Sequence, residues 1–172
     1  MEARVSKGPM KSLMRWLDAA GIDYEVHEHD RSLTALATAQ AEGVDPHTFE
    51  KVVWVRSAEG GDALMVLDAD DHLDLNKAKE VLRSGKVKLV AEEELATLAP
   101  DCDPGAMPAV GSLFGLPTYA DLHVCDSAEV SFNAGSHTVA VRVDRAAWEK
   151  ALGVVYADLA AATWREPAWH RS

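Results

Sequence analysis

Two short apolar runs, Lys51-Val52-Val53-Trp54-Val55 and Ala63-Leu64-Met65-Val66-Leu67, lie about ten residues apart in the middle of the chain. The turn-prone segment Gly60-Gly61-Asp62 lies between them. β-Branched and aromatic residues favour strands, and glycine with aspartate favours the tight turns that join antiparallel strands. This stretch therefore predicts a β-hairpin, and the remaining elements are expected to assemble around it.

Further elements are expected on both sides of the hairpin. Leu13, Leu17 and Ala20 recur at helical spacing before Gly21, a residue suited to end a helix. Segment 22–26 alternates with a period of two, which predicts a strand with Ile22, Tyr24 and Val26 facing inward. By the same reasoning, strands are expected at 87–90, 118–122, 129–132 and 138–143, and helices at 34–42 (capped by Thr34), 74–82, 91–99, around Trp148 and at 156–164.

Hairpins outnumber βαβ units in this order of elements. The chain is therefore predicted to have an α/β (α+β) fold, with a curled, barrel-like, mainly antiparallel or mixed sheet of six to seven strands surrounded by helices. Gly85 is expected to end the helix at 74–82, and Gly135 to turn the chain between the last two strands. Segment 100–117 is rich in glycine and proline but also carries apolar side chains, so a packed, structured loop is expected there.

The composition fits one globular domain. The chain has 172 residues, of which 48% are hydrophobic and 26% charged. We expect a loose arm at 1–10, a single domain at 11–165 and a short tail at 166–172. No apolar run approaches the ~18 residues of a membrane span. Two cysteines, Cys102 and Cys125, form no disulfide framework, which favours the cytoplasm.

The net charge limits the possible partners. Seventeen Lys and Arg residues stand against 28 Asp and Glu, which gives −11. A protein that wraps nucleic acid needs a basic surface to neutralise phosphates. The charge therefore excludes an extended nucleic-acid interface, and any contact with RNA is expected to use a small local patch or a partner's help.

The common catalytic motifs are absent from the sequence. There is no G-x-S-x-G, P-loop, G-x-G-x-x-G or H-E-x-x-H, and the serines and His137 lack the diagnostic spacing of a Ser-His-Asp set. His27-x-His29 and His123-x-Cys125 each place two possible metal ligands on one face of an expected strand. Neither pair has a third spaced ligand, so no metal or other cofactor is expected.

Three other features could carry chemistry. Lys51 opens an apolar strand, where it is either a solvated strand end or an anchor for a phosphate or ribose hydroxyl. The loop 100–117 could hold backbone groups in fixed directions around an acyl centre, or could be a plain connection. The polar segment 132–138 could let His137 orient water or a carbonyl, or could be an ordinary hairpin turn.

These three features occur in the order found in the YbaK/prolyl-tRNA synthetase-associated editing domains, the superfamily of the freestanding YbaK and ProX proteins, which the chain resembles from about Leu13 to Leu152. The ordered landmarks carry the resemblance, not any single motif. They are the opening helix with 21–24, the helix at 34–42, Lys51 before Val52-Val53, 66–70 leading to 73–75, the glycine-proline loop, 117–121 and 132–137.

The resemblance implies hydrolysis of the ester that joins an amino acid to the 3′ adenosine of a tRNA, without a cofactor. It implies that Lys51 holds the terminal nucleotide and that Gly105 to Pro108 present their backbone to the aminoacyl group, so Lys51, Gly105 and Pro108 are the expected catalytic residues. The expected substrate-binding residues are Tyr24, His29, Thr34, Gly111, Asn133, Gly135, Ser136 and His137.

The chain departs from the family pattern in the loop and the pocket. Gly105-Ala106-Met107-Pro108 is one residue shorter than the family's G-x-x-x-P, and Asn133-Ala134-Gly135 stands where ProX-type members have His-Pro-Leu. We therefore expect a freestanding trans-editing deacylase for a substrate such as Ala- or Cys-tRNA(Pro), with a synthetase or elongation factor as further partners and no membrane. The alternatives are a non-catalytic aminoacyl-tRNA-binding module that assists a synthetase, and a hydrolase for another small ester or amide.

Overall fold

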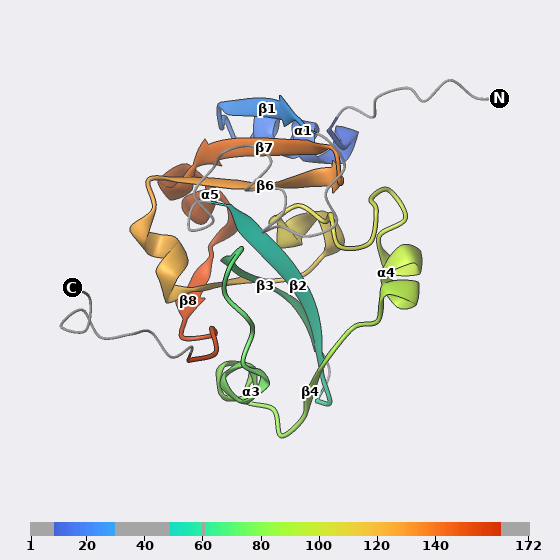
Figure 1. Ribbon diagram of the computed structural model, residues 1–172, viewed down its shortest axis with the longest axis vertical. Helices are drawn as coiled ribbons and strands as arrows, with labels where there is room; N and C mark the ends of the chain where they lie inside the picture. Colours follow the sequence, from blue (N-terminus) through green and yellow to red (C-terminus); the bar gives the residue numbers. More distant parts are fainter. Residues whose placement is uncertain (1–8, 30–48, 60, 163–172) are drawn as a thin grey trace, which may run out of the picture.

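The computed structural model describes residues 9–29, 49–59 and 61–162, and within them the chain forms two sheets with helices around them (Figure 1). The helices are α1 (Lys11–Ala19), α3 (Leu75–Leu82), α4 (Glu92–Leu98) and α5 (Arg145–Leu152), with short 3-10 helices η1 (Gly111–Phe114) and η2 (Leu122–Asp126). The strands are β1 (Tyr24–Glu28), β2 (Glu50–Ser57), β3 (Gly61–Asp68), β4 (Val87–Leu89), β5 (Thr118–Asp121), β6 (Glu129–Ser136), β7 (Val139–Asp144) and β8 (Val155–Ala157). None of the described helices is long and apolar enough to cross a membrane.

The predicted hairpin is confirmed and forms the centre of the larger sheet. β2 and β3 pair antiparallel in the order β4-β2-β3-β5-β8, and β5 and β8 join in parallel, so the sheet is mixed as expected. Residues 63–69, which cover most of β3 and the residue that follows it, are all buried. A strand covered on both faces reads as a continuous apolar run, which explains Ala63 to Leu67.

The smaller sheet lies across one end of the hairpin (Figure 1). It has the order β1-β7-β6, and both of its pairings are antiparallel. An isolated parallel bridge between Phe49 and Ser131 connects the start of β2 to β6. Between the sheets and α1 lies the main core, in which Leu13, Phe132 and Trp148 are fully buried. We call the junction of β2 with β6 at the Phe49–Ser131 bridge the seam.

Several local predictions need correction. Val26 is 43% exposed because it lies on the edge strand β1, whereas Ile22 is buried as expected. The turn between β6 and β7 is formed by 137–138, while Gly135 lies within β6 at a register shift. Helix α3 ends at Arg83, which adopts the left-handed conformation (φ 51°), two residues before Gly85. The amides of Arg83 and Ser84 donate to the carbonyls of Glu80 and Lys79, and these bonds close the helix without glycine.

The helix expected at 156–164 is also wrong over its described part. Residues 155–157 form strand β8, and the amides of Leu159 and Ala160 both donate to Oδ1 of Asp121 at 2.8 Å. A buried carboxylate that accepts two amides overrides the helix propensity of alanine. The single curled sheet that we expected is instead divided into two sheets and is not closed, so the term barrel-like applies only loosely. The eight described strands exceed the expected six to seven. The helix expected at 34–42 lies outside the described residues.

Candidate functional site

The glycine-proline loop packs against the end of β6. The Gly135 amide donates to the Ala106 carbonyl at 2.9 Å, and the Asp103 amide donates to the Gly135 carbonyl at 2.8 Å. Both Gly105 (φ +83°) and Gly135 (φ +93°) adopt a conformation that other residues rarely take. Two of the three features singled out in the sequence therefore form one structure. We call residues 104–108 and 133–137 together the seam site.

His137 fixes the loop from the β6 side. Its Nε2 donates to the Pro104 carbonyl at 3.0 Å, and a side chain at Gly105 would place its Cβ 3.6 Å from the His137 ring. His137 is 4% exposed, and its Nδ1 has no hydrogen-bond partner among the described residues. Because Nε2 carries the donated proton, Nδ1 of a neutral ring is an unused acceptor. The side-chain oxygen of Asn133 is a second such acceptor in the described part of the chain.

The loop also presents unused backbone donors. The loop carbonyls of Asp103 and Pro108 are bonded to Ala106 and Val110, but the amides of Gly105 and Met107 find no acceptor in the described ranges. Met107 is only 3% exposed. A buried amide without an acceptor is rare in native structures, so this amide is a natural donor for a ligand oxygen.

Lys51 lies on β2 at the seam. From the Phe49–Ser131 bridge, β2 and β6 run in parallel, so Lys51 and Asn133 each lie two residues further in the same direction. The Lys51 ammonium is half-buried and forms no hydrogen bond or ion pair with another described residue. Burial lowers its pKa below the ordinary lysine value, and the carboxylates of Asp71 and Asp70 act in the opposite direction.

Four of the other expected residues are also placed by the structure. His29 is brought to the β6–β7 turn, where its amide donates to the Thr138 carbonyl at 2.9 Å, and Ser136 bonds the Thr138 hydroxyl at 2.9 Å. Tyr24 lies at the other end of β1, opposite Val143, about 16 Å along the strand from His29. Pro108 is buried in the loop, and Thr34 lies outside the described residues.

Gly111 has a packing role of its own. Its amide donates to the Thr118 hydroxyl at 2.9 Å, and an added Cβ would lie 2.4 Å from that oxygen and 2.5 Å from the Leu116 carbonyl. No real side chain fits such a space. This contact accounts for glycine at position 111 without any ligand.

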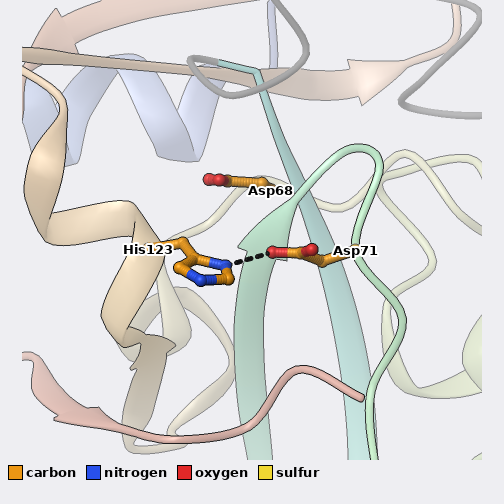
Figure 2. Close-up of side chains that lie close together, drawn as sticks. All are labelled: Asp68, Asp71 and His123. Carbon is orange, nitrogen blue, oxygen red and sulfur yellow. Dashed lines mark hydrogen bonds and ion pairs between the residues drawn. The ribbon is translucent and has the colours of Figure 1, made fainter. Parts of the chain in front are cut away.

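A second polar group, which the sequence analysis missed, lies at the end of β3. Ligand atoms of Asp68, Asp71 and His123 all lie within 4.8 Å of one another (Figure 2). His123 Nδ1 is 2.8 Å from Asp71 Oδ2 and 3.3 Å from Asp121 Oδ2. The bond to Asp71, and then the charge of Asp121, raise the pKa of His123. We call Glu50, Asp68, Asp71, Asp121 and His123 the acidic corner.

The metal pairs considered in the sequence do not correspond to this group. His123 and Cys125 lie on the 3-10 helix η2, so the expected strand pair is wrong, and the histidine's partners come from elsewhere in the chain. His27 instead contacts Glu25 at 3.3 Å. The available signal was the acidic run Asp68-Ala69-Asp70-Asp71 after an apolar strand.

Fold and seam site together define a class of protein: a mixed α/β domain with a glycine-built backbone loop facing a polar strand end. A family model described as the aminoacyl-tRNA editing domain matches residues 29–151, and the chain belongs to this family. It is thus an enzyme of the aminoacyl-tRNA deacylase type, a hydrolase that cleaves the ester between an amino acid and a tRNA. The expected family resemblance is confirmed. A comparison with curated proteins finds no match.

Solved structures share the fold. The hypothetical protein APE2540 is 21% identical with a TM-score of 0.80, and 88% of this chain covers 100% of it. A structure provisionally described as a trans-editing enzyme for prolyl tRNA synthetase is 24% identical with a TM-score of 0.76, over 89% of this chain and 97% of that one. A Marinobacter aquaeolei VT8 protein provisionally described as a signal transduction protein is 17% identical with a TM-score of 0.68, and 88% of this chain covers 30% of it.

Proposed function

We propose that this chain is a freestanding trans-editing deacylase that removes a small, wrongly attached amino acid, alanine or cysteine, from tRNA(Pro) or a similar tRNA. Membership of the editing family supports the reaction. The shared fold with a structure described in connection with prolyl tRNA synthetase supports the choice of tRNA. The substrate is made in the cytoplasm, where the free thiols of Cys102 and Cys125 would stay reduced.

The observation that carries this proposal is that a loop with an unused Met107 amide is bonded to the strand end that holds the unused acceptors of Asn133 and His137. When the ester carbonyl is attacked, negative charge develops on its oxygen. Fixed amide donors, Gly105 and Met107, would stabilise that charge without reorganising. Asn133 Oδ1 and His137 Nδ1 are suited to accept hydrogen bonds from the α-ammonium of the amino acid.

The nucleophile is water or a neighbouring ribose hydroxyl. The bond from the carbonyl carbon to the ribose oxygen breaks, and that oxygen takes a proton. With water as nucleophile, the amino acid leaves directly as a carboxylate. With the ribose hydroxyl, the acyl group first moves to the neighbouring oxygen and water then releases it. Lys51 would hold the terminal nucleotide through its ammonium, which is left unpaired among the described residues.

The other substrate contacts follow from their positions. His29 would border Ser136 of the seam site at the β6–β7 turn, while Pro108 and Gly111 would hold the loop in shape. Gly135 would contribute its backbone, in a left-handed conformation (φ +93°) in which an added Cβ would overlap the Met10 side chain. Tyr24, at the far end of β1, would meet a more distant part of the tRNA, and Thr34 is proposed from the family pattern. With a net charge of −11, a synthetase or elongation factor would help deliver the tRNA.

A deacylation panel tests this function. The full chain is incubated with Ala-tRNA(Pro), Cys-tRNA(Pro) and correctly charged Pro-tRNA(Pro), once in equal amount and once at a hundredth of the substrate. We expect repeated turnover of one or both mischarged tRNAs and protection of Pro-tRNA(Pro). Binding without turnover would identify a non-catalytic accessory module instead. Equal cleavage of free aminoacyl esters, with no gain from the tRNA, would identify a different esterase.

A further inference from the structure

The acidic corner concentrates four buried carboxylates. Glu50, Asp68, Asp71 and Asp121 are each at most 3% exposed. Asp121 is satisfied by three backbone amides, those of His123, Leu159 and Ala160. Burying ionised carboxylates is costly unless they are paired with cations or bind a metal. Close to this corner, His123 contacts Asp71, and the Lys51 ammonium acts on Asp71 electrostatically.

Glu50 provides an independent observation. It is 1% exposed, and neither of its carboxylate oxygens has a hydrogen-bond donor among the described residues. Glu50 is paired directly with Asp68 across the β2–β3 ladder, so both side chains point to the same face of the sheet. The two carboxyls therefore lie side by side on that face. A deeply buried, unsatisfied carboxyl is thus directed at the group in Figure 2.

We propose that Asp68, Asp71 and His123 bind one divalent transition-metal ion, Zn²⁺ or Mn²⁺, with Glu50 beside it as a further oxygen ligand. The ion would connect the segment after β3 to η2, more than fifty residues further along the chain. This metal site is separate from the proposed deacylation, because none of its residues belongs to the seam site.

The ligand atoms of Asp68, Asp71 and His123 lie within 4.8 Å of one another, so binding an ion would draw them together. Two ligands of a tetrahedral zinc ion lie about 3.3 Å apart. His123 Nδ1 and Asp71 Oδ2 are 2.8 Å apart, so the hydrogen bond between them would open by a few tenths of an ångström as Nδ1 loses its proton to bind the ion. The His123 side chain is 45% exposed, which leaves it free to turn.

Solvent can reach the site. Asp71 and His123 line a cavity of about 280 Å³, together with Lys77, Asp158 and Ala160. The Lys77 ammonium is bound to Asp158 at 2.9 Å and to the Ala160 carbonyl at 2.8 Å, and its charge also acts on Asp121. A hydrated ion has a route to Asp71 and His123.

The ligand types select the class of metal. Imidazole nitrogen with carboxylate oxygens suits zinc and manganese, whereas magnesium and calcium prefer sites made of oxygen alone. For such a site the affinity should follow Zn²⁺ above Mn²⁺, and both above Mg²⁺.

Calorimetry and thermal melting of the full chain test the proposal. After treatment with EDTA and its removal, Zn²⁺ and Mn²⁺ are titrated separately, with Mg²⁺ and Ca²⁺ for comparison. We expect one ion per chain and a rise in melting temperature of roughly 5 to 11 °C at a hundredfold excess over Kd. No stoichiometric binding of Zn²⁺ or Mn²⁺ would overturn the proposal.

Variants decide where the ion binds. Asp71→Asn and His123→Ala should each weaken metal binding by at least ~10-fold. Replacing a residue that only supports a metal ligand already costs about this much affinity. His123→Ala changes a half-exposed side chain, so its folding can be confirmed independently by melting without metal. The matched control His72→Ala removes an exposed neighbouring histidine, and Cys125→Ser removes the nearby thiol; both should bind as before. Unchanged binding in Asp71→Asn and His123→Ala, or its loss in either control, would overturn the assignment.

Discussion

The seam site and the acidic corner both lie beside the central hairpin but are built by opposite means. Residues 104–111 and 131–138 include no Asp, Glu, Lys or Arg, and the seam site offers amides, an imidazole and an amide side chain. The acidic corner instead gathers four buried carboxylates. One site depends on where the backbone lies, the other on which charges are present.

This difference has a consequence for an acidic protein that binds RNA. Phosphates are repelled by carboxylates, so the tRNA end must approach the seam from the uncharged side. Lys51 stands between the two regions, since it follows Glu50 in β2 and also interacts with Asp70 and Asp71. A change at Lys51 can therefore affect both the neutral site and the charged one.

The largest effect is expected from the backbone of the loop. Gly105→Ala should lower deacylation by ~10²-fold, because a φ of +83° strains any other residue and small misplacements of catalytic groups are costly. Stability should change by no more than ~1–2 kcal/mol. Met107→Ala is the matched control in the same loop, and it should lose stability but retain more activity. If Gly105→Ala is fully active, the neutral site does not work through its backbone.

The next effect concerns the residue between the regions. Lys51→Ala should raise KM and reduce kcat/KM about tenfold or more, which corresponds to about 1.4 kcal/mol of lost transition-state binding. The exposed Lys88→Ala on β4 serves as the control for loss of one positive charge. Equal kinetics for the two variants, with equal melting temperatures, would make Lys51 a solvated strand end.

A smaller effect is expected where the core holds the loop. The fully buried Trp148 donates from Nε1 to the Ala109 carbonyl at 2.7 Å. Trp148→Phe leaves this carbonyl unpaired and should cost ~1–3 kcal/mol, or roughly 2–4 °C of melting temperature per kcal/mol. Trp16→Phe removes a partly buried indole with no hydrogen bond to another described residue, so it should cost less. The reverse order in thermal melting would show that this bond does not support the loop.

The smallest effect is the response of tRNA binding to salt. Because the seam site is itself uncharged and only a few cations, such as Lys51 and Lys11, lie near it among the described residues, few phosphates should be neutralised. A plot of log K against log salt should then have a slope of about −1 to −3. Fluorescence titration of labelled tRNA between low and moderate salt measures it. A slope near −8 would reveal a basic surface and would contradict the description of the tRNA site as a neutral region.

Much of the local structure could be predicted because its causes are local. Residues 52–55 and 63–67 are β-branched or apolar and pair as expected. Asp74 accepts the amides of Asn76 and Lys77, and Asp144 accepts that of Ala147, so both helix starts follow from one side chain and its neighbours. The loop 100–117 packs as its apolar residues predict, with Met107 and Val110 buried.

What the sequence by itself determined is therefore the set of elements, the central hairpin and the polar, glycine-rich segments that carry the seam site. Tertiary structure decided that Gly105 and Gly135 meet, that 155–160 runs as a strand and loop, and that Glu50, Asp68 and His123 share one corner. Each of these depends on pairing between residues far apart in the chain, such as Asp121 with the amides of Leu159 and Ala160. Sequence periodicity reports only the face a residue presents, whereas burial and strand register decide which distant group it meets.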